Sequence, residues 1–166
     1  RIVKGDALNP EDVQRVISGT DAVVSLLGQS KQTDPWLQTR AIQHIISAMQ
    51  EEGLSRVVSL THFGVSAPAE DEPGILDKLM RYSMRLFIPK VYQDGITHAQ
   101  YLQAANLQWT IVRAPILTDE PQRGYYGIGA IGVNAGHQIS RADLSTFLLT
   151  LLADEPYYQQ LPVVSY

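Results

Sequence analysis

The sequence predicts an α/β fold in which helices cover both faces of a doubly wound parallel sheet. Strand-length apolar runs alternate with longer segments whose apolar residues repeat at helical spacing, as in strand–helix–strand units. Residues 22–27 (AVVSLL) are apolar at nearly every position, which is typical of a strand buried on both faces. With 166 residues, 45% of them hydrophobic, and no internal repeat or linker, residues 1–166 are expected to form a single domain.

Capping residues mark where the helices begin. The Asn-Pro pair at 9–10 and the Asp-Pro pair at 34–35 each place a side-chain acceptor before a proline at the first helical position. The Ser-Arg-Ala-Asp run at 140–143 carries its acidic residue three positions after the cap. In order, the predicted elements are a strand over 1–6, a helix over 10–18, a strand over 22–27, a helix over 35–52, a strand over 56–60, helices over 75–87 and 91–105 separated at Pro89, a strand over 109–113, a helix over 141–152 and a strand over 162–164.

Two segments are expected to be irregular. Residues 66–75 (SAPAEDEPGI) hold three acidic residues, two prolines and a glycine, and they predict a solvent-exposed loop or a flexible lid. Residues 124–139 are rich in glycine with single apolar residues between, and they predict irregular hairpin strands.

Composition argues against several kinds of partner. The 13 basic and 17 acidic residues give a net charge of -4, so we expect no nucleic-acid partner. Cysteine is absent and the four histidines lack close ligand spacing, so we expect no metal. No apolar run approaches the roughly 20 residues that cross a bilayer, and residue 1 begins no targeting peptide. We therefore expect a cytoplasmic protein without a membrane partner.

Gly127, Gly129 and Gly132 have the G-x-G-x-x-G spacing of a dinucleotide-binding loop. That function requires a strand before the motif, a helix after it and an acidic residue about 20 positions further on. Here the motif follows a turn-like Asp-Glu-Pro-Gln run at 119–122 and leads into Asn-Ala-Gly at 134–136. We interpret it as chance spacing among glycine-rich hairpin residues.

The ends of the predicted strands carry the candidate binding residues, because ligands of open parallel sheets bind beyond the carboxyl ends of the strands. Asp6 could accept hydrogen bonds from an adenine, and Gly28 could let a ring approach the backbone. Thr61 could donate its hydroxyl, and Pro115 could shape the wall of a pocket. Each also has a structural explanation, since such residues cap turns, end strands or bind local backbone. Their occurrence at successive strand ends predicts a pocket.

The chain resembles a known family over essentially its whole length. The matching segments are the Gly-Asp turn at 5–6, TDAVVSLLGQ at 20–29, RVVSLTHFGV at 56–65, NLQWTIVRAPILTDEP at 106–121 and ISRADLSTFLL at 139–149. In their order and spacing they are similar to the atypical short-chain dehydrogenases, above all to the NmrA-like and biliverdin/flavin reductase B group. The resemblance implies a Rossmann-like fold that binds NADP or NAD.

The resemblance also implies cofactor contacts at nine positions. Two would lie at the adenine, three along the adenosine and ribose, one near the nicotinamide ribose and three behind the nicotinamide ring. In that order they are Asp6, Ala7, Leu27, Gly28, Gln29, Thr61, Ala114, Pro115 and Ile116.

Two departures from the family's pattern bear on function. The family's glycine-rich phosphate turn belongs to a first βα unit that we expect upstream of Arg1, so residues 1–166 are expected to bind a dinucleotide weakly, with no preference assigned between NAD and NADP. The Tyr-x-x-x-Lys pair of typical short-chain dehydrogenases is also absent, and His62 stands where the family commonly has its catalytic serine. His62, with Thr61 beside it, is expected to donate a proton to the acceptor or to serve as a polar wall.

Polar residues elsewhere offer further candidates. Asp94, His98 and Tyr101 share one face of the helix predicted over 91–105, either as a second proton donor or as a solvated stripe. Arg113, inside a buried strand, is expected to anchor a carboxylate or a backbone carbonyl.

Together these features predict an NAD(P)H-dependent oxidoreductase of the atypical short-chain type. It would pass hydride to a small flat acceptor such as a flavin, a quinone or a carbonyl compound. The alternative is a non-catalytic NAD(P)-sensing regulator of the NmrA type. A third possibility is a chain without a function of its own, which an exposed sheet edge would mark.

Overall fold

The computed structural model describes residues 2–30, 32–153 and 157–166. In chain order its elements are α1 (Pro10–Ile17), β1 (Val23–Ser25), α2 (Leu37–Glu51), β2 (Arg56–His62), α3 (Ile75–Phe87), α4 (Pro89–Ala104), β3 (Gln108–Ala114), β4 (Ile116–Thr118), β5 (Gly127–Gly129), β6 (Gln138–Ser140), α5 (Arg141–Ala153) and β7 (Val163–Ser165).

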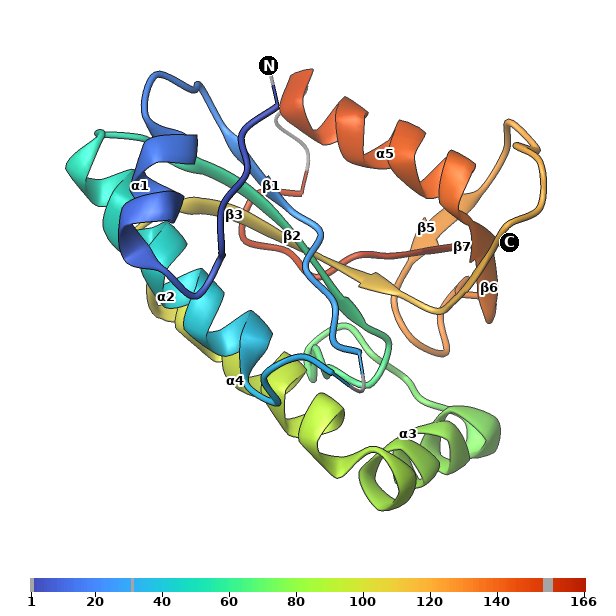
Figure 1. Ribbon diagram of the computed structural model, residues 1–166. Helices are drawn as coiled ribbons and strands as arrows, with labels where there is room; N and C mark the ends of the chain where they lie inside the picture. Colours follow the sequence, from blue (N-terminus) through green and yellow to red (C-terminus); the bar gives the residue numbers. More distant parts are fainter. Residues whose placement is uncertain (1, 31, 154–156) are drawn as a thin grey trace.

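Five strands form the central sheet, in the order β1-β2-β3-β7-β5 (Figure 1). The first four are parallel, and β5 runs antiparallel to β7. A second, two-stranded parallel sheet joins β4 to β6. The predicted α/β class with a largely parallel sheet is therefore confirmed.

Helices cover the two faces of the sheet unequally. Helices α1, α2 and α4 lie on one face and α5 lies on the other (Figure 1). Because neighbouring residues of a strand point to opposite faces, Val57 of β2 packs into the first core and Val58 into the second. Trp109 and Val112 of β3 divide in the same way.

Two of the three predicted helix caps are confirmed. Asn9 Oδ1 accepts a hydrogen bond from the Glu11 amide at 2.9 Å, and Ser140 Oγ accepts one from the Asp143 amide at 3.1 Å. The Asp34 carboxylate instead accepts from the Trp36 amide in a turn that precedes α2. Helix α2 therefore begins two residues later than the Asp-Pro pair indicates.

The strand predicted over residues 1–6 is wrong for residues 2–6, which lie outside any sheet, and Arg1 lies outside the described residues. An extended segment becomes a strand only by pairing with a neighbouring strand. Here the Lys4 carbonyl accepts from the Arg15 guanidinium at 3.2 Å, and the Asp6 amide donates to the Asp12 carboxylate at 2.8 Å. Residues 2–6 are therefore anchored on α1.

The two segments predicted to be irregular are more ordered than expected. The loop over 66–75 turns the Asp71 side chain inward, where only 2% of it is exposed, so the prediction of a wholly solvated loop is wrong at that residue. Within residues 124–139 the only antiparallel pairing is the bridge between Ala130 and Val133, whereas β5 pairs with β7 and β6 pairs with β4, so β5 and β6 are not the two strands of a hairpin. The strands of this segment belong to two different sheets.

The glycines of the G-x-G-x-x-G spacing are explained by this arrangement. Gly132 adopts a φ of +79° in the turn between Ala130 and Val133, a conformation that favours glycine. A side chain at Gly129 would collide with the Val133 carbonyl. The first two glycines of the motif lie in the edge strand β5 itself, and the next element is a strand, β6, so the interpretation as chance spacing agrees with the fold.

No helix within the described ranges is long and apolar enough to cross a bilayer. The same residues hold no cluster of three or more His, Asp or Glu side chains placed to bind a metal ion.

Candidate cofactor site

The carboxyl ends of three parallel strands meet at one edge of the sheet. Ser25 of β1 is in register with Ser59 of β2, and His62 of β2 is in register with Ala114 of β3. The side-chain amide of Gln38, in the first turn of α2, donates to the carbonyls of Leu27 at 2.6 Å and Leu60 at 3.4 Å. The predicted site residues that follow β1, β2 and β3 are thus brought to one edge.

A cavity of about 370 Å³ lies along β1, the edge strand of the sheet. It is bounded by the segment before α1, by the inner side of α1 and by β1 with the two residues after it. Three of the predicted cofactor contacts, Asp6, Ala7 and Leu27, line it together. Its walls are largely apolar valines, leucines and isoleucines, which suits the flat face of an aromatic ring.

Asp6 and Gly28 differ in how far structure alone explains them. The Asp6 carboxylate accepts from the Leu8 amide at 2.9 Å, so its turn-capping role is observed, although the residue stays exposed to solvent. Gly28 is exposed, and a methyl group built on it would meet nothing within 4 Å. Neither φ nor packing therefore requires glycine at position 28, and the approach of a ring to its backbone stays a prediction.

Asp94 connects α4 to the start of α2. Its buried carboxylate accepts from the backbone amides of Gln38 at 3.0 Å and Thr39 at 2.9 Å, so it caps α2 from a distant part of the chain. The same carboxylate accepts from the side-chain amide of Gln29, a predicted ribose contact, which also donates to the Pro35 carbonyl at 2.6 Å. Asp94 therefore positions the loop that follows β1.

The polar face of α4 is not a solvated stripe. Asp94 and His98 are both buried, and only Tyr101 is exposed. The three residues share one face of α4, as the sequence pattern predicted. At Asp94 this face packs against the start of α2, and at His98 it packs against β2.

The side chain of His62, the last residue of β2, lies against α4, and both of its ring nitrogens form hydrogen bonds. The Gly64 amide donates to Nδ1 at 3.0 Å, so the ring proton is on Nε2, which donates to the Tyr92 carbonyl at 3.2 Å. The ring also stacks on Tyr92, with centroids 5.8 Å apart. Burial lowers the pKa of His62, while hydrogen bonds to backbone carbonyls of α4 and the Asp94 charge oppose this. The imidazole is accordingly neutral, and its catalytic role stays a prediction.

Thr61 and His62 of β2 both lie close to Gly95 of α4. A methyl group at Gly95 would lie 2.6 Å from Cδ2 of His62 and 2.9 Å from Oγ1 of Thr61, so α4 approaches β2 too closely for a side chain. The Thr61 hydroxyl is buried and has no hydrogen-bond partner within the described residues. The structural explanation of Thr61, a bond to local backbone, is therefore not observed there.

At the end of β3, Ala114 and Pro115 are buried while Ile116 is exposed. The preceding residue, Arg113, is fully buried, and its guanidinium donates to both carboxylate oxygens of Asp71 at 2.8 Å and to the Leu161 carbonyl at 2.7 Å. The prediction that Arg113 anchors a carboxylate or a carbonyl is confirmed for both.

The Asp71 carboxylate accepts hydrogen bonds from three separate segments of the chain. Burial acts to raise its pKa, but hydrogen bonds from the Ala67 amide, Arg113 and the Ile131 amide outweigh burial and hold the pKa below its ordinary value. Asp71 is therefore ionised at neutral pH. It joins the loop after β2 to β3 and to the turn after β5.

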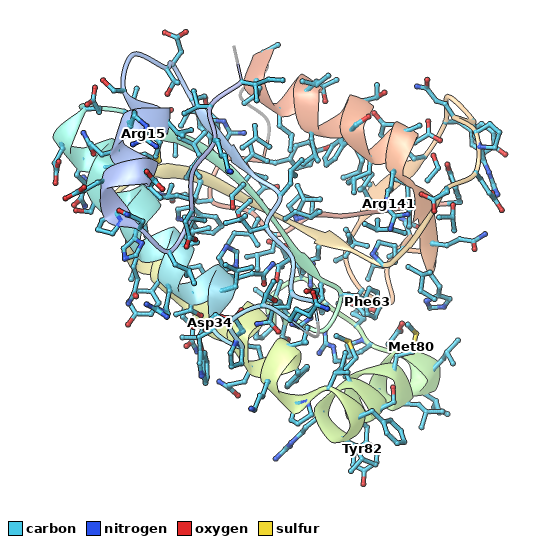
Figure 2. The ribbon with its side chains drawn as sticks, in the orientation of Figure 1. Arg15, Asp34, Phe63, Met80, Tyr82 and Arg141 are labelled. Atoms are coloured by element: carbon cyan, nitrogen blue, oxygen red, sulfur yellow. The ribbon has the colours of Figure 1, made fainter. Side chains whose placement is uncertain are left out.

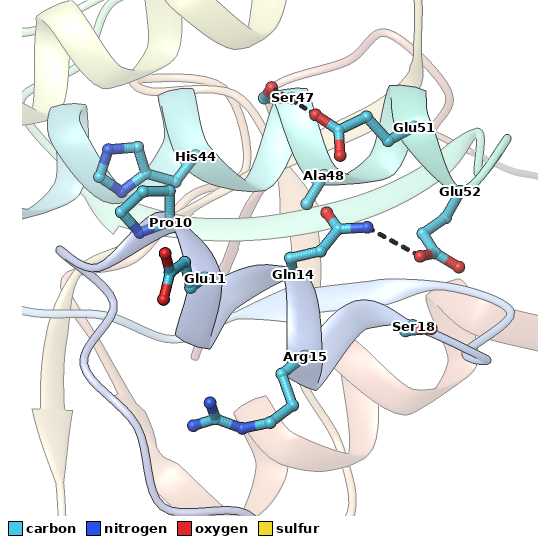
Figure 3. A pocket seen from close by; sticks show the side chains of 10 residues that line it. All are labelled: Pro10, Glu11, Gln14, Arg15, Ser18, His44, Ser47, Ala48, Glu51 and Glu52. Atoms are coloured by element: carbon cyan, nitrogen blue, oxygen red, sulfur yellow. Dashed lines mark hydrogen bonds between the residues drawn. The ribbon is translucent and has the colours of Figure 1, made fainter.

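A larger hollow of about 720 Å³ lies elsewhere, between α1 and α2 (Figure 3). Long polar side chains surround it, including Gln14, whose amide donates to Glu52 at 2.8 Å. It lies on the outer side of the helices rather than at the strand ends, and none of the predicted site residues lines it. The smaller cavity is lined by Asp6, Ala7 and Leu27 but not by Gly28, Thr61 or Pro115, so the position of the cofactor stays a prediction.

Sequence reasoning missed two contributors to this region and the capping role of a third. Gln38 and Gly95 carry no local signal, because a glutamine near a helix start and a glycine inside a helix are common. Asp94 offered a signal, its spacing from His98, but its partners are more than fifty residues away along the chain.

The fold and the strand-end site together define a dinucleotide-binding α/β protein of the Rossmann type. The NAD(P)H-binding family matches residues 1–155, and the chain belongs to that family. The family match confirms the expected cofactor of the chain as NADP or NAD, without distinguishing the two.

Solved structures share the fold at low identity. A short-chain dehydrogenase/reductase from Veillonella parvula, in complex with NADP, has a TM-score of 0.78 and 20% identity, over 99% of this chain and 71% of that one. The oxidoreductase ylbE from Lactococcus lactis has a TM-score of 0.75 and 19% identity, over 99% and 71%. The anaerobilin reductase ChuY from Escherichia coli O157:H7 has a TM-score of 0.72 and 22% identity, over 97% and 72%. The resemblance to atypical short-chain dehydrogenases is thus confirmed.

Proposed function

We propose that the chain is the NAD(P)H-binding domain of an oxidoreductase that passes hydride to a small flat acceptor, such as a flavin, a quinone or a carbonyl compound. One observation carries the proposal, in a chain of the NAD(P)H-binding family. Gly28 follows β1, Thr61 is the last residue but one of β2 and Pro115 follows β3, and these are three neighbouring parallel strands. Neighbours of the same fold that are described as reductases support it.

The residues present fit the adenosine half of a dinucleotide. The apolar cavity beside β1 would take the adenine, with Asp6 at its rim and Leu27 in its wall. The open backbone at Gly28 would lie against the sugar. At the other end, Pro115 would form a wall two residues after Arg113, which is ion-paired to the buried Asp71. A reduced nicotinamide held at that wall would supply the hydride, and the chain's own part is to orient the ring and exclude water.

Binding and turnover distinguish the proposal from its rivals. The purified full-length protein is titrated with NADPH and NADH by fluorescence, and the absorbance of the reduced nicotinamide is then followed with a quinone or a flavin present. Binding with turnover is expected. Binding without turnover would contradict the enzyme, and the absence of binding to either dinucleotide would contradict every NAD(P)-dependent function.

Two glycine variants test the position of the cofactor. Gly28→Ala adds a methyl group where nothing lies within 4 Å, so the melting temperature should not change, but dinucleotide affinity should fall by about tenfold, or about 1.4 kcal/mol. Gly127→Ala is the matched control, because its new methyl group would meet only ordinary contacts at 3.5 Å or more. Equal affinities for both variants would place the cofactor elsewhere.

His62 is proposed as the proton donor to the acceptor, with Thr61 beside it. Because the ring is neutral, Nδ1 would first have to take up a proton and release the Gly64 amide, and the Nε2 proton would then have to leave the Tyr92 carbonyl for the acceptor. His62→Gln, which keeps a side-chain donor, should lower turnover and change its pH profile while dinucleotide affinity stays the same. An unchanged rate would remove His62 from the mechanism.

A second candidate function is a non-catalytic NAD(P) sensor of the NmrA type. The engagement of both His62 ring nitrogens within the chain favours it, because no proton is then poised for an acceptor. Tight dinucleotide binding with no turnover of any flat acceptor is the result that this candidate requires.

A further inference from the structure

Helix α3 presents an apolar stripe to solvent. Ile75, Leu79, Tyr82 and Leu86 recur at helical spacing along one side, and they are 88%, 60%, 63% and 59% exposed. Of the thirteen residues of α3, only Asp77 is buried. None of the helix's apolar side chains belongs to the hydrophobic clusters of the described residues. An exposed stripe of this size on an otherwise well-packed chain marks an interaction surface.

The position of α3 leaves this stripe accessible. The helix lies at one corner of the molecule and packs mainly against α4 (Figure 1). Tyr82 points away from the body of the protein (Figure 2). On the inner side of the helix, Arg81 pairs with the buried Asp71 at 3.0 Å, so the rotation of α3 about its axis is fixed with the stripe outward.

Basic residues flank the stripe. Residues 75–92 contain Lys78, Arg81, Arg85 and Lys90 but only one acidic residue, in a chain whose net charge is -4. That acidic residue, Asp77, turns inward and accepts from the Gly74 amide at 2.9 Å. Lys78, Arg85 and Lys90 form no ion pair within the described residues. The exposed charges of residues 75–92 are therefore all positive.

We propose that α3 docks on a membrane surface that contains anionic lipids. The apolar stripe would enter the boundary between headgroups and acyl chains, and Lys78 and Arg85 would contact the lipid phosphates and carboxylates. A strongly amphipathic helix with basic flanks and leucine, isoleucine and aromatic residues on its apolar side is the type that lies in this interface. Its 13 residues extend about 20 Å, enough for such a contact.

The charge pattern argues against a second copy of the chain as the occupant. Pairing two α3 stripes face to face would bring the Lys78 and Arg85 side chains of both copies together. Asp77, the acidic residue of the helix, is turned inward and cannot neutralise them. An anionic lipid surface supplies the charge that a second copy lacks. The expectation of no membrane partner rested on the lack of a spanning segment, which surface docking does not need.

Vesicle binding tests the proposal. The purified full-length protein is sedimented with vesicles of phosphatidylcholine alone or of an equal mixture of phosphatidylcholine and phosphatidylserine. Binding to the mixed vesicles is expected, and it should weaken as salt is raised. A Tyr82→Trp variant should show a blue-shifted emission on these vesicles, since that side chain would leave water.

Charge substitutions on the stripe give the decisive comparison. The double variant Leu79→Glu with Leu86→Glu should bind the mixed vesicles at least about tenfold more weakly. Leu149→Glu is the matched control, because this leucine is 66% exposed on α5, and its binding should equal that of the unaltered protein. Thermal unfolding of the variants confirms that each folds.

Several results would overturn the proposal. They are no binding to the mixed vesicles, equal binding to phosphatidylcholine alone, or equal loss in the Leu149→Glu control. A dimer seen by light scattering that the double variant dissociates, without vesicle binding, would instead identify a second copy as the occupant. These outcomes are separate from the test of dinucleotide binding, because the stripe lies apart from the cavity beside β1.

Discussion

Lowering the pH from 6.5 towards 4 is expected to destabilise the folded protein through His98. This side chain is 2% exposed, Nε2 is hydrogen-bonded to Ser59 Oγ at 2.8 Å, and Nδ1 has no partner within the described residues. Burial lowers the pKa of His98 to about 4. The nearby Asp94 charge acts to raise this pKa and offsets only part of the burial effect, while the nearby His62 lowers the pKa further. The unfolded chain binds the same proton with the ordinary pKa of 6.5.

The size of the effect follows from linkage. Between pH 6.5 and about 4 the unfolded state holds one more proton at this site than the folded state, so stability rises with pH across that window. Each pKa unit is worth about 1.4 kcal/mol, so a fall from 6.5 to about 4 corresponds to about 3 kcal/mol of unfolding free energy. At about pH 5, about 2 kcal/mol of this is already lost.

Two measurements check this reasoning. Urea unfolding at about pH 7.5 and about pH 5 should show the loss in the unaltered protein, and His98→Gln should remove about 2 kcal/mol from the difference. The NMR signal of the His98 Cε1 proton should titrate far below that of a free histidine. A His98 signal that titrates near 6.5, or the same pH dependence in His98→Gln, would refute the argument.

Three further substitutions test the packing around the site. Asp71→Ala leaves the buried Arg113 guanidinium without its carboxylate and should lower the unfolding free energy by about 3–5 kcal/mol in urea denaturation. Gly95→Ala places a methyl group against Nε2 and Cδ2 of the His62 ring, 2.6 Å from the latter, and should cost about 1–3 kcal/mol, measured as a lower melting temperature. Asp94→Asn weakens the cap of α2 and should cost about 1–2 kcal/mol, with faster hydrogen exchange at the first amides of that helix.

Neighbouring variants serve as controls for these changes. Glu72→Ala removes an exposed carboxylate beside Asp71 and should alter stability by less than about 0.5 kcal/mol. Gly28→Ala introduces the same methyl group as Gly95→Ala, but into open space. Equal losses in either matched pair would contradict the packing described, and so would unchanged exchange in Asp94→Asn.

Local patterns predicted much of the fold because helices and buried strands leave signals in short windows. The cap at Asn9 depends on a hydrogen bond between residues close in the chain. The apolar run at 22–27 forms a strand only over Val23–Ser25 and is not buried on both faces as predicted, because β1 is the edge strand and Leu26 is 58% exposed. Residues 2–6 failed as a strand because strand pairing depends on a distant partner. For the same reason, the segment over 124–139 was mistaken for a hairpin although its strands belong to two sheets.

The sequence by itself determined that Gly28, Thr61 and Pro115 would lie at one edge of the sheet, because the carboxyl ends of parallel strands share that edge. Only the tertiary structure decided what those ends are packed against. The cap that Asp94 supplies to α2 and the neutral state of His62 both depend on contacts with segments far away in the chain. Burial and pKa are set by whichever segment folds against a side chain, and sequence spacing does not encode that partner.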